Sequence, residues 1–141
     1  MEVKDIMTNQ VVTVHPGESV EIAARTMPQY IIGALPVCSN CKLCGMLTDR
    51  DIVTRCLAAS RSPEQTKVRQ VMTEQVTPVR PDMEVGVAAH LMGRLQVRRL
   101  PVVENGKLCG MVSLGDMAVR EESVLDAGDA LADVSSNLSE R

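Results

Sequence analysis

The stretch "ALPVCSNCKLCGMLTDRD" (residues 34–51) recurs later in the chain as "RLPVVENGKLCGMVSLGD" (99–116). Further out, "VKDIMTNQVVTVHP" (3–16) recurs as "VRQVMTEQVTPVRP" (68–81). The two copies align without a gap, and 22 of 53 aligned positions are identical. Two copies are too few for a solenoid, so we expect a pseudo-twofold pair of repeats that share one core.

Each copy predicts the same order of elements: strand, helix, strand, strand, helix. Short β-branched runs followed by proline indicate the first strand, and apolar residues at helical spacing indicate the helix after it. Pro28 and Gly93 are expected to end these first helices. The expected segments are 11–14, 19–27, 34–38, 42–47 and 49–59 in the first copy, and 76–79, 84–92, 99–103, 107–113 and 116–124 in the second. The order implies an α/β fold in which each repeat is a small mixed sheet packed against two helices.

The same pattern predicts the domain organisation. We expect a first repeat at 1–60, a linker at 61–67, a second repeat at 68–122 and a tail at 123–141. Glu121 and Glu122 are expected at an exposed helix end. The tail carries apolar residues at helical spacing, namely Ala127, Leu131, Val134 and Leu138. Two alternatives are open for it: the tail either docks as a short helix or frays.

Composition excludes several classes of protein. The chain has 141 residues, 45% of them apolar and 23% charged, as is typical of a globular domain. No apolar run approaches the roughly 20 residues that cross a bilayer, and the N-terminus does not resemble a signal peptide. We therefore expect a cytoplasmic protein with no membrane partner. A net charge of −3, with no Trp, no Phe and one Tyr, disfavours nucleic-acid binding, which needs basic and aromatic surface.

Three cysteines in the first copy, spaced C-x-x-C-x-x-C, raise the question of a metal or redox site. The second copy suggests an answer, because its Asn105-Gly106 pair predicts a hairpin with a two-residue type I′ turn. Transferred to the first copy, that register pairs Val37 with Cys44 and places Cys38 and Cys44 on opposite faces of the hairpin.

Sulfur atoms arranged in this way do not surround one zinc ion, and the only histidines, His15 and His90, lie elsewhere in the sequence. We therefore predict no metal site. Cys44 and Cys109 are interpreted as small buried residues, Cys41 as an exposed thiol that can be oxidised, and Cys56 as a residue on a helix face. A redox or metal-responsive protein that uses Cys38, Cys41 and Cys44 stays open as an alternative function.

The chain resembles a tandem cystathionine β-synthase (CBS) domain pair, also called a Bateman module. The resemblance rests on the repeated "LPV…GMLTDRD" and "LPV…GMVSLGD", which are preceded by "DIMT" and "QVMT". The resemblance covers residues 3 to about 122 and extends to the small stand-alone bacterial members of the family. It implies a regulatory, energy-sensing protein that binds an adenosine-containing ligand in clefts between the repeats. The ligand would be AMP, ADP, ATP or S-adenosylmethionine, with no required cofactor.

The family signature is Gly, two apolar residues, Ser or Thr, two further residues, then Asp. It falls on Thr48 with Asp51 and on Ser113 with Asp116. A carboxylate accepts two hydrogen bonds from vicinal ribose hydroxyls, and a helix that starts at the aspartate offers N–H groups to an anion. The alternative is structural, because an aspartate near a helix start is a good cap and an arginine follows each one four residues on.

The copies differ just before the "LPV" strand, where family members often carry His or Arg that reaches ligand phosphates. The second copy has Arg98 and Arg99 there, and the first has Gly33 and Ala34. Strand alternation points the two arginines to opposite sides, so at most one serves a given cleft. A solvated arginine pair is the alternative. We expect two unequal sites, the stronger one involving Asp116 and one arginine.

Other family positions complete the prediction. Thr8 and Thr73 match positions that approach the nucleotide. No phosphate-binding loop, no H-E-x-x-H and no arrangement of Cys, His and acid indicates catalysis, so we predict that the protein is not an enzyme.

The resemblance also implies a homodimer formed through helix surfaces and a regulated partner protein that the sequence does not identify. The apolar sets expected there are Ile52, Val53 and Leu57, and Met117, Val119 and Val124. An interaction module with degenerate ligand sites is a further alternative.

Overall fold

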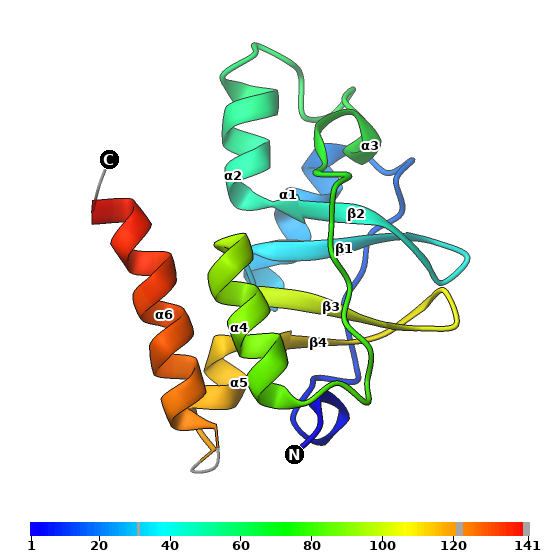
Figure 1. The fold of residues 1–141 in the computed structure, drawn as a ribbon. Coiled ribbons are helices and arrows are strands. Elements are labelled where there is room, and N and C mark those ends of the chain that lie inside the picture. The colour runs from blue at the N-terminus through cyan, green and yellow to red at the C-terminus, as the bar shows by residue number, and fades with distance from the viewer. Residues whose placement is uncertain (31, 121–122, 140–141) are drawn as a thin grey trace. The chain divides into compact units, whose positions relative to one another are not determined.

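The computed structural model describes residues 1–30, 32–120 and 123–139 and divides the chain into two compact units (Figure 1). Unit 1 comprises Met1–Val11, Thr77–Asn105 and Cys109–Arg141, and unit 2 comprises Val12–Val76 and Gly106–Leu108. These units differ from the sequence repeats in two respects. The short stretch Gly106–Leu108 of the second repeat groups with unit 2. The leading segment of each repeat (residues 3–11 and 68–76) belongs to the unit that holds the rest of the other repeat.

Unit 2 is built on one antiparallel hairpin with helices around it. Its elements are α1 (Val20–Gln29), β1 (Ala34–Ser39), β2 (Lys42–Thr48), α2 (Asp49–Asp51), the π-helical segment η2 (Ile52–Leu57) and α3 (Val68–Val71). Val68 and Val71, from the leading segment of the second repeat, are buried in the core of this unit with Leu35, Val37 and Leu47.

Unit 1 has the same plan with an added helix. Its elements are η1 (Val3–Asp5), α4 (Val85–Leu95), β3 (Arg99–Glu104), β4 (Lys107–Ser113, of which the first two residues group with unit 2), α5 (Leu114–Ala118) and α6 (Val124–Ser139). Val3 and Ile6, from the leading segment of the first repeat, are buried in its core with Leu100, Val102 and Val112. The predicted α/β class is confirmed.

Both hairpin turns have the predicted type I′ geometry, in which both central residues adopt positive φ. The φ angles are 53° and 78° at Asn105 and Gly106, and 53° and 67° at Asn40 and Cys41. Cys41 therefore holds a left-handed conformation that glycine adopts more readily, at the position where the second copy has Gly106.

The predicted register of the first hairpin is correct at the turn and wrong beyond it. Cys38 faces Leu43 as expected, but Val37 faces Gly45 rather than Cys44, because a bulge inserts one extra residue. Cys44 packs against the core cluster to which Val37 belongs. Since neighbouring residues on a strand point to opposite faces, Cys38 still lies on the other face of the hairpin.

The strands predicted before the first helices are not formed over their expected length. Only one residue of each, Val14 and Val79, makes a β-bridge. Val14 bonds to β1, and Val79 to β3, through both its N–H and its carbonyl. The residue two positions further on is a proline in both copies, Pro16 and Pro81. Proline has no N–H to donate, so the ladder cannot continue there.

Contrary to the prediction, Pro28 and Gly93 do not end the first helices. Pro28 lies within the last turn of α1, where its fixed φ is compatible with a helix. α4 continues through Gly93 and ends before Gln96, which adopts a left-handed conformation with φ 60°. The Gln96 side chain donates from Nε2 to the Gly93 carbonyl at 2.7 Å and so caps the helix end.

The second helices also differ from the prediction. In the first copy α2 continues as the π-helical η2, whereas in the second copy α5 already ends at Ala118. The hydroxyl of Ser123 donates to the Met117 carbonyl at 2.7 Å, a carbonyl that a continuing helix would use. Glu121 and Glu122, expected at the exposed end of this helix, lie outside the described residues.

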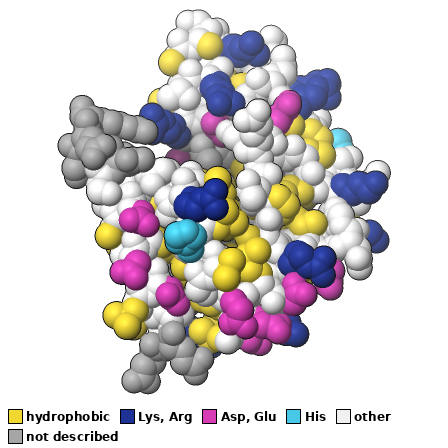
Figure 2. Space-filling view, in the orientation of Figure 1, with side chains coloured by type: hydrophobic (Ala, Val, Ile, Leu, Met, Phe, Trp, Pro, Cys, Tyr) yellow, Lys and Arg dark blue, Asp and Glu magenta, His cyan; other side chains and the backbone are white. Residues whose placement is uncertain are grey.

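The tail forms α6, which runs beside α4 (Figure 1). Ala127, Ala130 and Val134 are buried, whereas Leu131, expected on the same stripe, is 45% exposed. The side chain of Leu138 lies outside the described residues. Figure 2 shows acidic side chains along this helix, which has no basic residue. None of the described helices, α6 included, has the length and apolar character needed to cross a bilayer.

Two glycines of α4 allow α6 to approach closely. A Cβ atom at Gly93 would lie 2.8 Å from Oδ2 of Asp133, and one at Gly86 would lie 3.3 Å from Oδ2 of Asp126. The first copy has larger residues, Glu21 and Pro28, at the equivalent positions. These glycines, which lower helix propensity, therefore mark the side of α4 that receives α6.

Each leading segment passes very close to a hairpin glycine. Thr73 pairs with Met46 through two backbone hydrogen bonds of 2.8 and 2.9 Å. A Cβ atom at Gly45 would lie 2.5 Å from the Thr73 carbonyl oxygen, and one at Gly110 would lie 2.9 Å from that of Thr8. A side chain is therefore excluded at both glycines by backbone that has little room to move.

Gly45→Ala should destabilise the protein, because the added methyl group would overlap a backbone carbonyl. We expect the free energy of unfolding to fall by about 1–3 kcal/mol, measured by urea denaturation. Gly128→Ala on α6 is the control. A Cβ atom there meets nothing within 4 Å, so alanine should raise stability by about 0.5–1 kcal/mol. Equal stability of Gly45→Ala and wild type would contradict the close approach.

Candidate functional site

In unit 2 the candidate site is built on a capping box at the start of α2. The hydroxyl of Thr48 accepts a hydrogen bond from the Asp51 N–H at 3.0 Å, and Oδ2 of Asp51 accepts one from the Thr48 N–H at 3.0 Å. This reciprocal pair caps the helix. The structural role weighed for the aspartate is thus present, and it uses one oxygen of the carboxylate.

Two further side chains lie against the same carboxylate. The hydroxyl of Thr73, in the leading segment of the second repeat, lies 3.3 Å from both carboxylate oxygens of Asp51. Nε of Arg55 lies 3.8 Å from Oδ1, as the four-residue spacing predicted. Asp51 is only 7% exposed, so its carboxylate is enclosed and largely satisfied by the protein itself.

The equivalent carboxylate in unit 1 is more open. Ser113 and Asp116 form the same capping box, with hydrogen bonds of 2.9 and 3.1 Å. Asp116 is half-buried. Within the part of the chain that the structure describes, no hydrogen bond or ion pair reaches its Oδ1. Thr8 pairs with Met111 through backbone bonds of 2.8 and 3.0 Å, but its side chain is exposed and does not bond to Asp116.

The first helix begins at Asp49, as the expected segment 49–59 has it, and the second begins at Leu114, two residues earlier than expected. Each signature aspartate therefore lies inside its helix. In unit 2 the first N–H groups already have acceptors. The Asp49 N–H donates to the Gly33 carbonyl at 2.9 Å, and the Arg50 N–H donates to Oδ1 of Asp49 at 2.8 Å. Since the Asp51 N–H is bonded too, this helix start has no N–H left for an anion.

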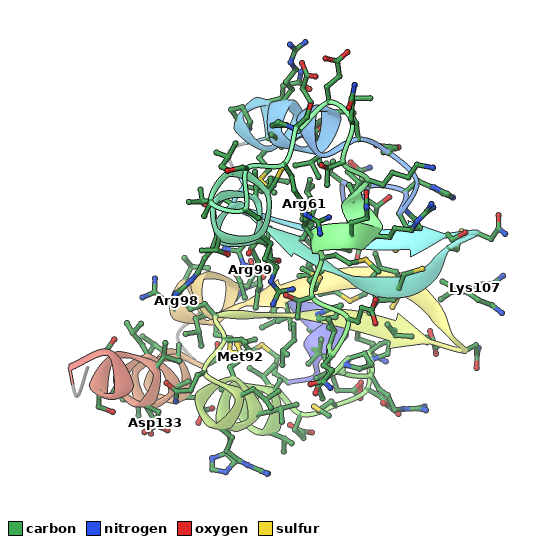
Figure 3. All side chains as sticks on the ribbon, turned by 90° about the horizontal axis from the view of Figure 1, so that it is seen from above. Arg61, Met92, Arg98, Arg99, Lys107 and Asp133 are labelled. Carbon is green, nitrogen blue, oxygen red and sulfur yellow. The ribbon has the colours of Figure 1, made fainter. Side chains whose placement is uncertain are left out.

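The charge around the positions before the two "LPV" strands differs between the units. A Cβ atom at Gly33 would lie 3.0 Å from the Asp49 carboxylate, so an acidic group occupies this place in unit 2. In unit 1 Arg98 and Arg99 are exposed and form no ion pair with the described residues. Figure 3 shows the two arginines leaving the start of β3 in different directions. The carbonyl of Arg98 accepts the Leu114 N–H at 2.9 Å, which ties this strand end to the helix that carries Asp116.

The cysteines do not assemble into a metal site. Among the described residues, no group of three or more His, Cys, Asp or Glu side chains is placed to hold a metal ion. Cys41 is exposed as predicted, whereas Cys44 and Cys109 are only partly buried and Cys56 is fully buried. Burial, with a smaller contribution from the nearby Cys44 and Cys41, raises the pKa of the Cys38 thiol to about 11. That thiol is therefore protonated and unreactive near neutral pH.

Two contacts of unit 2 were not predicted from the sequence. Nη1 of Arg55 donates to the Met72 carbonyl at 3.1 Å and to the Val71 carbonyl at 3.4 Å. The hydroxyl contact between Thr73 and Asp51 was missed as well. Identical residues at equivalent positions in both copies were a signal of shared importance. They did not reveal that a leading segment packs against the other repeat.

The family model and the sequence relatives that match this chain point to the same family. The sequence matches the CBS domain family twice, at residues 3–58 and 68–123. It is 45% identical over 133 residues to the CBS domain-containing protein YhcV of Bacillus subtilis, covering 94% of each chain.

Two solved structures are informative. One is Hypoxic Response Protein I with two coordinated zinc ions. It has a TM-score of 0.79 and 35% identity, and the match covers 85% of this chain and 98% of that chain. The other is the CBS domain pair of protein MJ0100 in complex with 5′-methylthioadenosine and S-adenosylmethionine. It has a TM-score of 0.75 and 27% identity, and the match covers 84% of this chain and 94% of that chain.

The cysteines of the first hairpin should differ strongly in reactivity. At pH 8 a thiol with a pKa of about 11 is ionised in about one molecule per thousand, so iodoacetamide should label exposed Cys41 well before Cys38. Labelling of Cys38 should rise by about tenfold per pH unit up to pH 11. Peptide mass spectrometry of timed samples measures both rates, and equal labelling at pH 8 would overturn the assignment.

Proposed function

Because this chain belongs to the CBS domain family, we propose that it is a non-catalytic regulatory protein that binds an adenosine-containing nucleotide. The candidate ligands are AMP, ADP, ATP and S-adenosylmethionine. Support comes from the MJ0100 CBS domain pair, which is described in complex with two adenosyl compounds. The zinc ions are a property of Hypoxic Response Protein I, and the proposal for this chain does not include a metal.

The observation that carries this proposal is the open carboxylate oxygen of Asp116. Oδ2 of this residue accepts the Ser113 N–H and fixes the side chain, which leaves Oδ1 to accept hydrogen bonds from a ligand. A half-buried carboxylate in a fixed position can bind the vicinal hydroxyls of a ribose, because its lone pairs accept hydrogen bonds from two O–H donors. The Ser113 hydroxyl, which accepts the Asp116 N–H, can still donate its own proton to a ligand.

Charge near this carboxylate favours a phosphorylated ligand. Arg98 and Arg99 have no carboxylate partner among the described residues, and a guanidinium binds phosphate oxygens in a fork geometry. The first site has Gly33 and Ala34 at these positions and the Asp49 carboxylate close by. We therefore assign the stronger site to Asp116 with one of the two arginines, and the weaker site to Thr48, Asp51 and Thr73.

A second candidate function is an interaction module in which the first site has become structural. The enclosed carboxylate of Asp51 favours this reading for unit 2, since the protein itself supplies its hydrogen-bond donors. Both readings are regulatory, and both require a partner protein that responds to the module. In the first, the ligand acts by favouring one packing of the module over another.

We also propose a homodimer formed through exposed apolar helix surface. Two of the six residues expected there are unavailable, because Ile52 and Met117 are buried in the cores of their units. The other four are exposed, by 55% at Val53, 54% at Leu57, 81% at Val119 and 44% at Val124. Val53 and Leu57 lie four residues apart on η2, and contiguous exposed apolar surface is typical of interfaces between subunits.

The nucleotide proposal is tested by thermal unfolding with AMP, ADP, ATP and S-adenosylmethionine, with GMP as the control ligand. A ligand at 100 times its dissociation constant should stabilise the protein by roughly 2.7 kcal/mol, a shift of roughly 5–10 °C at this size. Asp116→Asn should abolish the shift and leave the ligand-free melting temperature nearly unchanged.

Asp51→Asn is the matched variant for that experiment. It should lower the ligand-free melting temperature, because an amide keeps the cap of α2 but replaces the charged oxygen that faces Thr73 and Arg55. It should keep most of the nucleotide shift. Absence of a shift with every adenosyl ligand would remove the nucleotide proposal and leave the interaction module.

The dimer is tested by light scattering coupled to size exclusion. Wild type should elute at about twice the chain mass of 15.3 kDa, whereas Val53→Asp with Leu57→Asp should elute at the chain mass, since buried unpaired carboxylates oppose association. Leu125→Asp, at a residue 82% exposed on α6, is the control and should leave the dimer intact. A monomeric wild type would refute the proposal.

A further inference from the structure

The side chains that enclose the first carboxylate also occur near the second one, but they are used differently. Thr73 corresponds to Thr8, and Arg55 corresponds to Arg120, with the same offset along the sequence. In unit 2 both side chains contact the aspartate. In unit 1, among the described residues, neither does. The difference therefore lies in the backbone around each aspartate and not in the identity of these residues.

The helix that follows each aspartate explains the difference for the arginine. After Asp51 the chain continues as η2, whose widened turns are seen in the bond from the Ala58 N–H to the Val53 carbonyl at 2.9 Å. Arg55 lies on this segment and reaches back to the aspartate and the leading segment. α5 ends at Ala118, so Arg120 lies beyond the helix. π-Helical segments are rare and often accompany functional sites.

Arg55 and Thr73 together hold the end of the leading segment. Arg55 donates to the carbonyls of Met72 and Val71, the residues at which α3 ends, and the Thr73 hydroxyl lies against Asp51. Residues 74–78 beyond this point have no helix or strand, and most are exposed. Among the described residues, the bonds made by Arg55 and Thr73 are therefore the last side-chain hydrogen bonds that hold this segment before a stretch without regular structure.

The Thr73 hydroxyl occupies the place that a ribose would need. One oxygen of Asp51 already accepts the Thr48 N–H, and the hydroxyl proton of Thr73 lies within reach of both oxygens. A ribose diol bound to this carboxylate would donate to the same lone pairs. Ligand and hydroxyl therefore compete for one acceptor.

We propose that Thr73 and Arg55 form a latch on Asp51 that closes the first nucleotide site in the ligand-free protein. This inference rests on the proposed function. A nucleotide enters the Asp116 site without rearrangement, whereas at Asp51 it must first displace the Thr73 hydroxyl and loosen residues 72–78. Occupancy of the first site is then reported by the mobility of this segment, which leads from unit 2 into unit 1 along the sequence.

The latch is tested first without any ligand, by hydrogen exchange on the full chain. Thr73→Val and Arg55→Gln should each speed amide exchange of residues 72 and 73 by about tenfold, because local opening costs less free energy once a contact is lost. Thr73→Ser keeps the hydroxyl and should restore slow exchange. The matched controls Thr8→Val and Arg120→Gln change the same residue types in unit 1 and should leave residues 7 and 8 unchanged.

Unchanged exchange in both Thr73→Val and Arg55→Gln would overturn the latch, whether or not the protein binds nucleotides. Global unfolding would be recognised by faster exchange in the cores of both units. In that case the Thr73→Ser protein decides: slow exchange at residues 72 and 73 supports the latch, and fast exchange there overturns it.

The second arm is calorimetric titration with AMP. Wild type should bind one AMP tightly and a second more weakly, and Thr73→Val should tighten only the second by about tenfold. Asp116→Asn removes the first event and isolates the second. Two equal events in wild type would overturn the latch. No AMP binding in any variant would remove the nucleotide proposal for this ligand, while the exchange experiment still decides the latch.

Discussion

The contact on which both units depend is the close approach of a leading segment to a hairpin glycine. At Gly45 the Thr73 carbonyl comes so near that no side chain fits, and Gly110 receives Thr8 in the same way. Because close packing fixes neighbouring groups, in unit 2 this contact brings Val68 and Val71 into the core and Thr73 to the signature aspartate. The geometry of the candidate site therefore follows from a packing requirement.

One framework serves two electrostatic purposes in this chain. The capping box is identical in both copies and commits one carboxylate oxygen to the fold. In unit 2 the second oxygen is also committed, to Thr73 and Arg55, and Asp51 is nearly inaccessible. In unit 1 that oxygen has no described partner. A duplicated arrangement can thus keep its residues while the carboxylate is enclosed by the protein in one copy and open in the other.

The repeat in the sequence was sufficient to predict the class of fold and both type I′ turns. Capping by each aspartate was the alternative weighed against ligand binding, and it too depends on neighbours within a few residues. Local patterns were less reliable at Gly93, where a glycine expected to end a helix instead admits α6. The bulge at Cys44 departs from the regular register that the turn alone predicts, and the contact of Thr73 with Asp51 joins residues 22 apart in the sequence. Such features arise from tertiary packing, which a single sequence does not display.

The exchange of leading segments also sets an order for folding. Unit 2 is nearly continuous along the chain, so its core can close once residue 76 has left the ribosome. Unit 1 needs Val3 and Ile6, from the very start of the chain, to meet strands that are made last. Contacts between such distant residues have high contact order and form slowly. Val3 and Ile6 are therefore synthesised well before the strands on which they pack and reach their final positions late. A fragment ending at the linker would lack part of each core.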